Sequence, residues 1–422
     1  MKIKISQEIL VHAIERGAVA ALSDEAAQDN SNVSMLIQSL KITAKKEKIV
    51  FESTTNVLSS KYELKVDLNN GVEVQEEGVV LVQAKPLHQW LNTQKKSTIG
   101  LRLKSFETSK SINSSEDIEQ QDGNVIQIVG DLLLTSKDEN GTGDKWKLDC
   151  YDENQVTMTS FEDKKDIHVS IPVSELDKAT KLIKISLLPK DWNHIYDSFV
   201  LEKIDGKVVL ASTDCARCSV YELETADLID DSFFDKSRVF VNGNHLLSIL
   251  KLASSTETAN IFFDSKENKC YVQLSNLFFR ISSPDKDQRE KFPKLETLLK
   301  TKYIDVGSMD KNPLQKRISA ASIVNSDSIQ FVFEGGKDKA KVNSISETGK
   351  APTSGLTSVE NCSKDLKAVF SVKHLNEFIK TIGGDNLSLK VMENGGNVFV
   401  FCDDSVPNSR MYTMKKDSSI YS

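Results

Sequence analysis

A unit of one helix, strand hairpins, a second helix and further hairpins recurs three times along the 422 residues, and this repeat limits the possible folds. The second helix of each unit is amphipathic: Leu246 and Ile249 in one copy, and Leu375 and Phe378 in another, lie at three-residue spacing. The segments that follow alternate apolar and polar residues, as antiparallel strands with one solvated face do. Helices packed on antiparallel sheets make this an α+β fold.

The units define the predicted domains. The first helices are expected at 6–18, 172–184 and 310–322, and the second helices at 82–94, 241–254 and 370–384. With boundaries in polar connectors, we predict three domains, at 1–163, 164–296 and 297–422. A polar stretch at about 104–124 lacks hydrophobic periodicity, and we expect it to be a mobile insertion in the first domain.

Composition limits the environment of the chain. No apolar run approaches the roughly 18 to 20 residues that span a bilayer, and charges interrupt the N-terminal apolar residues, so we expect no secretory signal. Six cysteines spread over the chain fit a reduced compartment better than a disulfide scaffold. A cytoplasmic protein with free thiols is therefore expected.

Motifs for catalysis or metal binding are weak. The pair Cys215 and Cys218 has no second pair and no histidine at zinc-ligand spacing, and in an extended segment the two thiols would point to opposite faces. His88, His245 and His374 recur in the second helices, where we expect solvated residues. The sequence contains no Gly-rich phosphate loop and no nucleophile elbow. We therefore predict a protein that is not an enzyme and holds no cofactor or metal.

Positive charge recurs on the helices although the chain carries a net charge of −7. A basic surface inside an acidic shell would contact duplex phosphates without reading sequence. Solvated helix faces also carry lysines, so recurrence in three units is what favours DNA. The residues predicted to face DNA are Arg16, Lys85, Lys178, Lys181, Lys184, Lys251, Lys316, Arg317 and Lys380.

Three segments resemble one family, in the same order along the chain. The stretch VVLASTDCARCSVYEL resembles a strand segment that typically reads ATDGHRLA, with Thr213, Asp214 and Arg217 retained. The stretch FRISSPDKDQREKFPKLETLL resembles a segment that ends in FPDY, and MYTMKKD lies where that family has its C-terminal tail. The chain thus resembles the bacterial DNA polymerase III beta subunit, the beta sliding clamp, as a divergent member.

The resemblance implies a head-to-tail homodimer of three-domain subunits, that is, a six-domain ring around duplex DNA. Such a clamp raises polymerase processivity by tethering the enzyme, which is an effective-concentration effect. The implied partners are double-stranded DNA, DNA polymerase, the clamp loader and other proteins with a clamp-binding motif.

The family binds partner peptides in a pocket between the second and third domains. Carried over by position, its wall comprises Tyr196, Thr213, Arg217, Cys218, Pro293, Leu298 and Met414. Cys218 stands where the family has Leu, Ala216 replaces the usual His, and the tail lacks its Pro, so the preferred peptide is expected to differ. For the ring interface we predict Trp146 and Leu148 against Ile323 and Val324.

Two alternatives stay open. A clamp-like scaffold or decoy that does not load on DNA would explain the altered pocket and the divergent tail. An enzyme that uses the cysteine pair would need bound zinc or a reactive thiolate of low pKa.

Overall fold

The computed structural model divides the chain into two compact units, Met1–Ile167 with Thr258–Ser282 and His168–Glu257 with Ser283–Ser422. It describes residues 1–23, 36–94, 97–112, 126–138, 141–159, 161, 168–188, 195–234, 238–264, 266–324, 326–345 and 353–415. Within these ranges only the backbone is described at 108–112 and 231–232. No described helix is long and apolar enough to cross a membrane.

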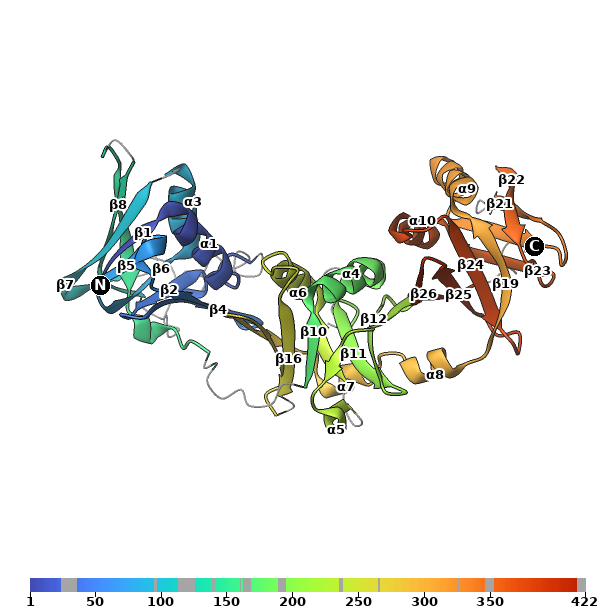
Figure 1. Ribbon diagram of the computed structural model, residues 1–422, viewed down its shortest axis with the longest axis horizontal. Helices are drawn as coiled ribbons and strands as arrows, with labels where there is room; N and C mark the ends of the chain where they lie inside the picture. Colours follow the sequence, from blue (N-terminus) through green and yellow to red (C-terminus); the bar gives the residue numbers. More distant parts are fainter. Residues whose placement is uncertain are drawn as a thin grey trace, which may run out of the picture. The chain divides into compact units, whose positions relative to one another are not determined.

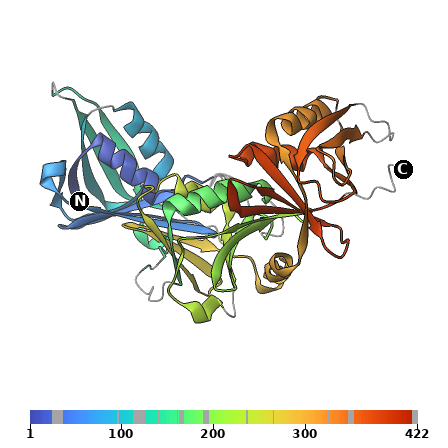
Figure 2. The same cartoon turned by 45° about the vertical axis from the view of Figure 1, so that its right-hand side comes forward.

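The first unit is an antiparallel sheet covered by two helices. Its strands follow the order β16-β17-β18-β4-β3-β2-β6-β9-β8-β7-β1-β5. Their bounds are β1 Lys2–Ser6, β2 Ser39–Ala44, β3 Lys48–Thr54, β4 Leu58–Lys65, β5 Val72–Glu76, β6 Gly78–Gln83, β7 Thr98–Ile112, β8 Ile126–Lys137, β9 Lys145–Tyr151, β16 Thr258–Asp264, β17 Lys269–Leu274 and β18 Leu277–Ser282. Helices α1 (Gln7–Gly17) and α3 (Ala84–Thr93) lie side by side on one face of the sheet (Figures 1 and 2).

Helix α1 has hydrogen-bonded ends and one apolar face that packs on the sheet. The Ser6 side chain accepts a hydrogen bond from the N–H of Ile9 and caps the N-terminus. Leu10 and Ile14, one turn apart, are fully buried against the sheet. At the other end the Gly17 carbonyl accepts hydrogen bonds from the hydroxyls of Ser53 and Ser60, so a buried helix end keeps its partners.

The second unit carries one 12-stranded sheet and a short strand pair. The sheet order is β15-β11-β12-β13-β26-β25-β24-β19-β22-β21-β20-β23, and β10 pairs with β14. The strands are β10 Val169–Pro172, β11 Ser198–Ile204, β12 Lys207–Thr213, β13 Arg217–Glu222, β14 Asp227–Leu228, β15 Val239–Asn242, β19 Tyr303–Asp310, β20 Ser328–Phe333, β21 Lys339–Ile345, β22 Ser354–Glu360, β23 Leu366–Ser371, β24 Asn386–Met392, β25 Val398–Asp403 and β26 Val406–Met414.

The helices of this unit are α4 Val173–Ile183, α5 Asp231–Phe234, α6 Gly243–Leu250, α7 Lys286–Arg289, α8 Leu295–Lys300, α9 Lys311–Ile323 and α10 Val372–Thr381. Helix α9 lies beside α10, over the strands that include β19 and β24 (Figure 1). All six helices expected from the amphipathic pattern are therefore present, and the predicted α+β clamp-type fold is confirmed.

Two apolar clusters occupy opposite faces of β25 and β26. Phe399, Phe401 and Met411 pack with residues of α9 and α10. Because side chains alternate along a strand, Val400 and Tyr412 point the other way, into a second cluster that includes residues of α8. This second cluster contains the predicted pocket residue Cys218 and packs against Tyr196 and Leu298.

Two hairpins show the internal repeat most directly. Residues 48–64 and 207–223 align without a gap, and the pair Ser53 and Ser60 matches the pair Ser212 and Ser219. In both hairpins the two serines are directly opposite across the strands. The Ser212 hydroxyl donates to the carbonyl of Ile183 at the end of α4, as Ser53 does at the end of α1. The repeat therefore extends to the hydrogen bonds that end a helix.

Three expectations need correction. Residues 104–112, expected as part of a mobile insertion, belong to strand β7, which pairs with β8 across a register shift; the remainder of the insertion falls outside the described residues. His245 was expected to be solvated but is only 6% exposed, because it shares the buried face of α6 with Ile249. His88 and His374 are both half-buried rather than solvated. The domain boundaries at 163 and 296 stay predictions.

Candidate functional site

A tight turn between β12 and β13 positions the best-defined polar site. The Asp214 Oδ1 atom accepts hydrogen bonds from the N–H groups of Ala216 (3.1 Å) and Arg217 (2.9 Å). The Thr213 hydroxyl donates to the Arg217 carbonyl at 2.7 Å. Cys215, at the exposed tip, adopts φ of 70°, a left-handed conformation that favours Gly. The turn therefore fixes the start of β13 and the direction of the Arg217 side chain.

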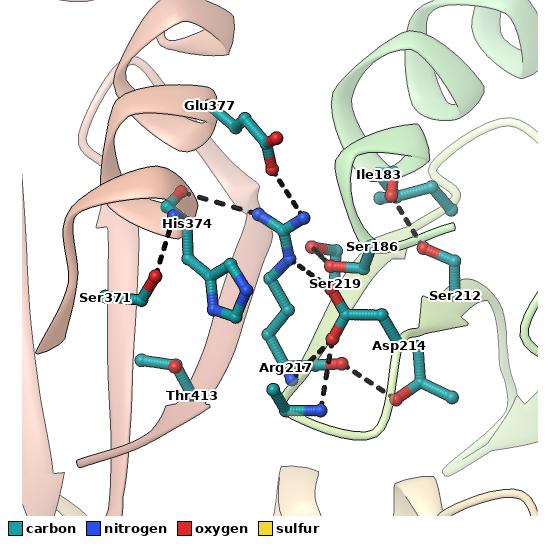
Figure 3. A network of polar contacts seen from close by, with 12 residues as sticks. Ile183, Ser186, Ser212, Asp214, Arg217, Ser219, Ser371, His374, Glu377 and Thr413 are labelled. Carbon is teal, nitrogen blue, oxygen red and sulfur yellow. Dashed lines mark hydrogen bonds and ion pairs between the residues drawn. The ribbon is translucent and has the colours of Figure 1, made fainter. Parts of the chain in front are cut away.

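Arg217 lies between two carboxylates, one from its own turn and one from a distant part of the chain. Its Nε donates to Asp214 Oδ2 at 2.7 Å, and its Nη2 forms an ion pair with Glu377 Oε2 of α10 at 2.5 Å (Figure 3). Its Nη1 reaches the His374 carbonyl at 3.5 Å. The side chains of Arg217 and Asp214 are each only 5% exposed. We call these four residues the Arg217 network; it joins the β12–β13 turn to helix α10.

His374 lies in the field of this arginine. Burial, reinforced by the positive charge of Arg217, lowers the pKa of His374 below its usual range. The ring is therefore neutral near pH 7, and adding a second positive charge beside Arg217 is unfavourable. The backbone N–H of His374 donates a hydrogen bond to the Ser371 hydroxyl, which caps the start of α10 (Figure 3).

The cysteine pair does not form a shared site. Cys215 is exposed in the turn, whereas Cys218 is buried on β13 opposite Tyr412. Burial, with the Asp214 charge as a lesser cause, raises the pKa of the Cys218 thiol to about 12, so it stays protonated. Within the described ranges no group of three or more His, Cys, Asp or Glu side chains could hold a metal ion.

The predicted pocket residues come together in the second unit but differ in access. Thr213, Arg217 and Cys218 are buried by the protein's own side chains. Tyr196, Pro293 and Leu298 are half-buried, and Met414 at the end of β26 is 55% exposed. Side chains of the same unit therefore cover Thr213, Arg217 and Cys218, whereas the other four predicted pocket residues are at least partly exposed.

The residues predicted to face DNA lie on or next to helices. All are exposed except Arg16, which is half-buried with its guanidinium over the Tyr62 ring. Lys181 forms an ion pair with Asp177 of the same helix, and Lys178 lies near the Tyr221 ring. Arg317 lies against Gly355 of β22. Lys85, Lys184, Lys251, Lys316 and Lys380 are exposed on α3, just after α4, just after α6, on α9 and on α10.

The residues predicted for the ring interface are described separately in each unit. In the first, Trp146 of β9 stacks on Trp90 of α3, with ring centroids 5.8 Å apart, and Leu148 is half-buried. In the second, Ile323 at the end of α9 is 81% exposed and Val324 follows it at the surface.

Sequence reasoning missed Glu377 and the roles of His374 and Tyr412. Glu377 lies 160 residues from Arg217 in the sequence, so no local pattern connects them. His374 offered a signal: it is four residues from the buried Phe378, on the same face of α10. Tyr412 lies beside the buried Met411 on a strand, and the alternation gave no means of telling which face was covered.

The fold is that of the sliding clamps. A crystal structure of the DNA polymerase III beta subunit from Pseudomonas aeruginosa matches with a TM-score of 0.76 and 15% identity, covering 99% of this chain and 100% of that one. The Caulobacter crescentus beta sliding clamp matches with a TM-score of 0.75 and 12% identity, covering 99% of both chains. No family model matches the sequence.

Sequence similarity points to the same family. The beta sliding clamp of Mycoplasma capricolum subsp. capricolum is 20% identical over 369 residues, which are 87% of this chain and 88% of that protein. The predicted resemblance to the bacterial beta sliding clamps, as a divergent relative, is therefore confirmed.

Proposed function

We propose that this chain is a processivity clamp that closes as a head-to-tail homodimer around duplex DNA and tethers a polymerase. The observation that carries the proposal is the clamp fold over 99% of the chain. A closed ring is linked to DNA by topology, so its contacts with phosphates can stay weak and independent of sequence. In this account the protein is not an enzyme, acts in the cytoplasm, and is loaded by a clamp loader.

The exposed lysines on α4 and α9 support the contact with DNA. Lys178 and Lys181 on α4 and Lys316 on α9 are all exposed, so phosphates can approach them, and Lys181 would exchange its surface ion pair with Asp177 for a phosphate contact. Replacing all three with Ala should weaken retention on nicked circular DNA and reduce the salt dependence of log K by up to about 3, at about 0.9 per phosphate contact.

A matched control removes the same charge from hairpin turns. Lys45, Lys207 and Lys337 are exposed at or beside such turns. The triple Ala variant at these positions should keep both the retention and the salt slope. Equal losses in the two triple variants would contradict the assignment of α4 and α9 to DNA.

Topology is tested by cutting the DNA. Protein loaded on nicked circular DNA by the clamp loader and ATP should coelute with the circle and dissociate after a restriction enzyme linearises it. Retention on the linear DNA would argue against a ring.

A scaffold or decoy that does not load on DNA is the second candidate. The departures from the family at Ala216 and Cys218 and in the tail after Met414 favour it, because they alter the positions at which clamp partners are expected to dock. A protein that binds polymerase but is never retained on circular DNA would support this function instead.

A further inference from the structure

The sheet of the first unit has a second face, turned away from α1 and α3. Ile3, Leu101, Leu134 and Trp146 are directly opposite one another across β1, β7, β8 and β9, and the Trp146 ring stacks on Trp90 of α3. These residues therefore lie on the face that the helices cover. Because side chains alternate along a strand, their neighbours in the sequence point to the other face.

Basic side chains gather on this other face. The same cross-strand pairing brings together seven exposed cations, which are Lys2, Lys4, Arg102, Lys104, Lys137, Lys145 and Lys147. We call them the basic sheet face. The carboxylates on the same side of the sheet are those of Glu73, Glu76, Asp131 and Asp149. The face therefore has an excess of positive charge, in a chain whose net charge is −7.

The helices on the opposite side of the sheet carry no such excess. Helix α1 contributes the charges of Glu8, Glu15 and Arg16, and α3 contributes that of Lys85. These four charges balance one another. Of the two layers, the basic sheet face is therefore the one that attracts anions.

The carboxylates on this side do not cancel the charge. Asp131, which is opposite Lys104, already forms an ion pair with Lys147 at 2.5 Å. Glu73 and Glu76 lie on the edge strand β5. Among the residues that the structure describes, no carboxylate oxygen lies within 4.0 Å of the charged groups of the other six cations.

Two of these cations face each other directly. Lys2 of β1 is opposite Arg102 of β7, and Lys104 follows two residues further along β7 on the same face. Like charges directly opposite each other destabilise a sheet. An anion that contacts both side chains offsets this repulsion. The strand pair is therefore suited to a negatively charged partner.

The spacing of the cations suits a phosphate backbone. Residues two apart on a strand are separated by about 6.8 Å. Each strand of duplex DNA carries one phosphate about every 3.4 Å along the helix axis. Several cations of one sheet face can therefore reach phosphates of the same duplex. Charge of this kind supplies most of the affinity in DNA binding that is independent of sequence.

Other anionic partners fit less well. Gly100, Leu133 and Thr135 lie between the cations, and Leu133 is half-buried. None of them is an exposed large apolar residue, whereas stable attachment to a membrane takes a second signal besides charge. None of them is aromatic, so these positions give no platform on which the bases of a single strand could stack.

We propose that the basic sheet face is a second DNA-binding surface, which contacts the phosphates of a duplex without reading its sequence. The proposal goes beyond the proposed function, because it places DNA on the side of the sheet that α1 and α3 do not cover. It also does not require a ring.

Binding of the full chain to covalently closed circular DNA, without clamp loader or ATP, tests this surface. A closed ring cannot thread onto such a circle, so the binding reports on surfaces outside the hole. Replacing Lys2, Arg102 and Lys104 together with Gln should weaken binding at least tenfold at low salt. The salt slope of log K should fall by up to about 3, at about 0.9 per phosphate contact. An unchanged affinity would overturn the proposal.

Two further triple variants separate this surface from others. The control replaces three exposed lysines of the second unit with Gln and should keep the affinity and the slope; these are Lys207, Lys337 and Lys367. The helix variant, with Ala at Lys178, Lys181 and Lys316, should lose less affinity for the closed circle than the sheet-face variant does. An equal or greater loss in either of them would overturn the proposal.

Unfolding in urea separates lost binding from lost folding. Because Arg102→Gln removes a like charge opposite Lys2, it should leave the urea midpoint unchanged or raise it. A lowered midpoint would contradict the repulsion on which the proposal rests. If the triple sheet-face variant fails to fold, Lys104→Gln alone decides, with an expected decrease in the salt slope of about 0.9. An unchanged slope in that variant would overturn the proposal.

Two other polyanions test the identity of the partner. Vesicles of phosphatidylserine and phosphatidylcholine, and the peptide poly-glutamate, are compared with DNA at the same ionic strength. The wild-type protein should bind DNA at least tenfold more tightly than either of them. Tighter binding to the vesicles or to poly-glutamate would overturn DNA as the partner of this face.

Discussion

Arg217 and His245 are two buried titratable side chains of the second unit. Arg217 is held by Asp214 and Glu377, and removing one member of a buried ion pair leaves the other charge without compensation. His245 shows the same cost of burial in a neutral group: burial lowers the pKa of this histidine to about 4. Both residues therefore lead to predictions for the free energy of unfolding.

Replacing Arg217 with Ala should lower the free energy of unfolding by about 3 to 5 kcal/mol, because the Asp214 carboxylate stays buried without its partner. Urea unfolding followed by circular dichroism measures the change. The exposed pair of Lys181 and Asp177 provides the control, since Lys181→Ala should change stability by less than about 0.5 kcal/mol. A small effect of Arg217→Ala would show that the network is not structural.

The pKa of His245 predicts how stability depends on pH. An unfolded His takes up a proton near pH 6.5, whereas the folded protein resists it until about pH 4. The unfolded state thus binds more protons between these values, and the free energy of unfolding falls as the pH decreases, by up to about 3 kcal/mol. His245→Gln should lose this part of the pH dependence. Parallel curves for the two proteins would contradict the prediction.

Among the elements, the β12–β13 turn has a counterpart in the first unit. The Thr55 hydroxyl accepts hydrogen bonds from the N–H groups of Val57 and Leu58, as Asp214 does from Ala216 and Arg217. Where Arg217 begins β13, the fully apolar Leu58 begins β4 and is buried. The same turn therefore supports a core residue in one unit and a charged network in the other.

The strained tip of this turn gives an element-scale prediction. Cys215 has a positive φ, which costs a non-Gly residue roughly 1 to 2 kcal/mol, and it is exposed, so its side chain contributes little packing. Cys215→Gly should raise the free energy of unfolding by about 0.5 to 1 kcal/mol. Ala216→Gly, at a neighbouring position without positive φ, should lower it. Thermal unfolding that ranks the two variants the other way would refute this explanation.

Hydrophobic periodicity was enough to predict the helices and hairpins, because each element buries one face. It failed at β7, where Lys104, Ser105 and residues 110–112 pair with β8 on either side of a register shift although this polar stretch has no apolar pattern. It also failed for the partners of Arg217, because the contact with Glu377 depends on how β13 pairs with β26. The pocket positions came from the family resemblance, whereas their burial depends on side chains such as Tyr412 that the sequence does not place.

At the scale of the whole molecule, the clamp fold supports our proposal that two chains close into a ring. The predicted interface joins residues of both units, Trp146 and Leu148 with Ile323 and Val324. The high exposure of Ile323 suits a residue that a second copy covers. A charged side chain at either Trp146 or Ile323 would then have to be buried in the dimer.

The solution mass, measured by light scattering across a concentration series, distinguishes a closed dimer from a monomer. We predict a dimer of about twice the 47.0 kDa chain mass. Trp146→Glu and Ile323→Glu should each shift it to the monomer, while Ile229→Glu, at an exposed apolar residue outside the interface, should not. A monomer at every concentration would rule out the ring, and a dimer that neither interface variant disturbs would rule out this interface.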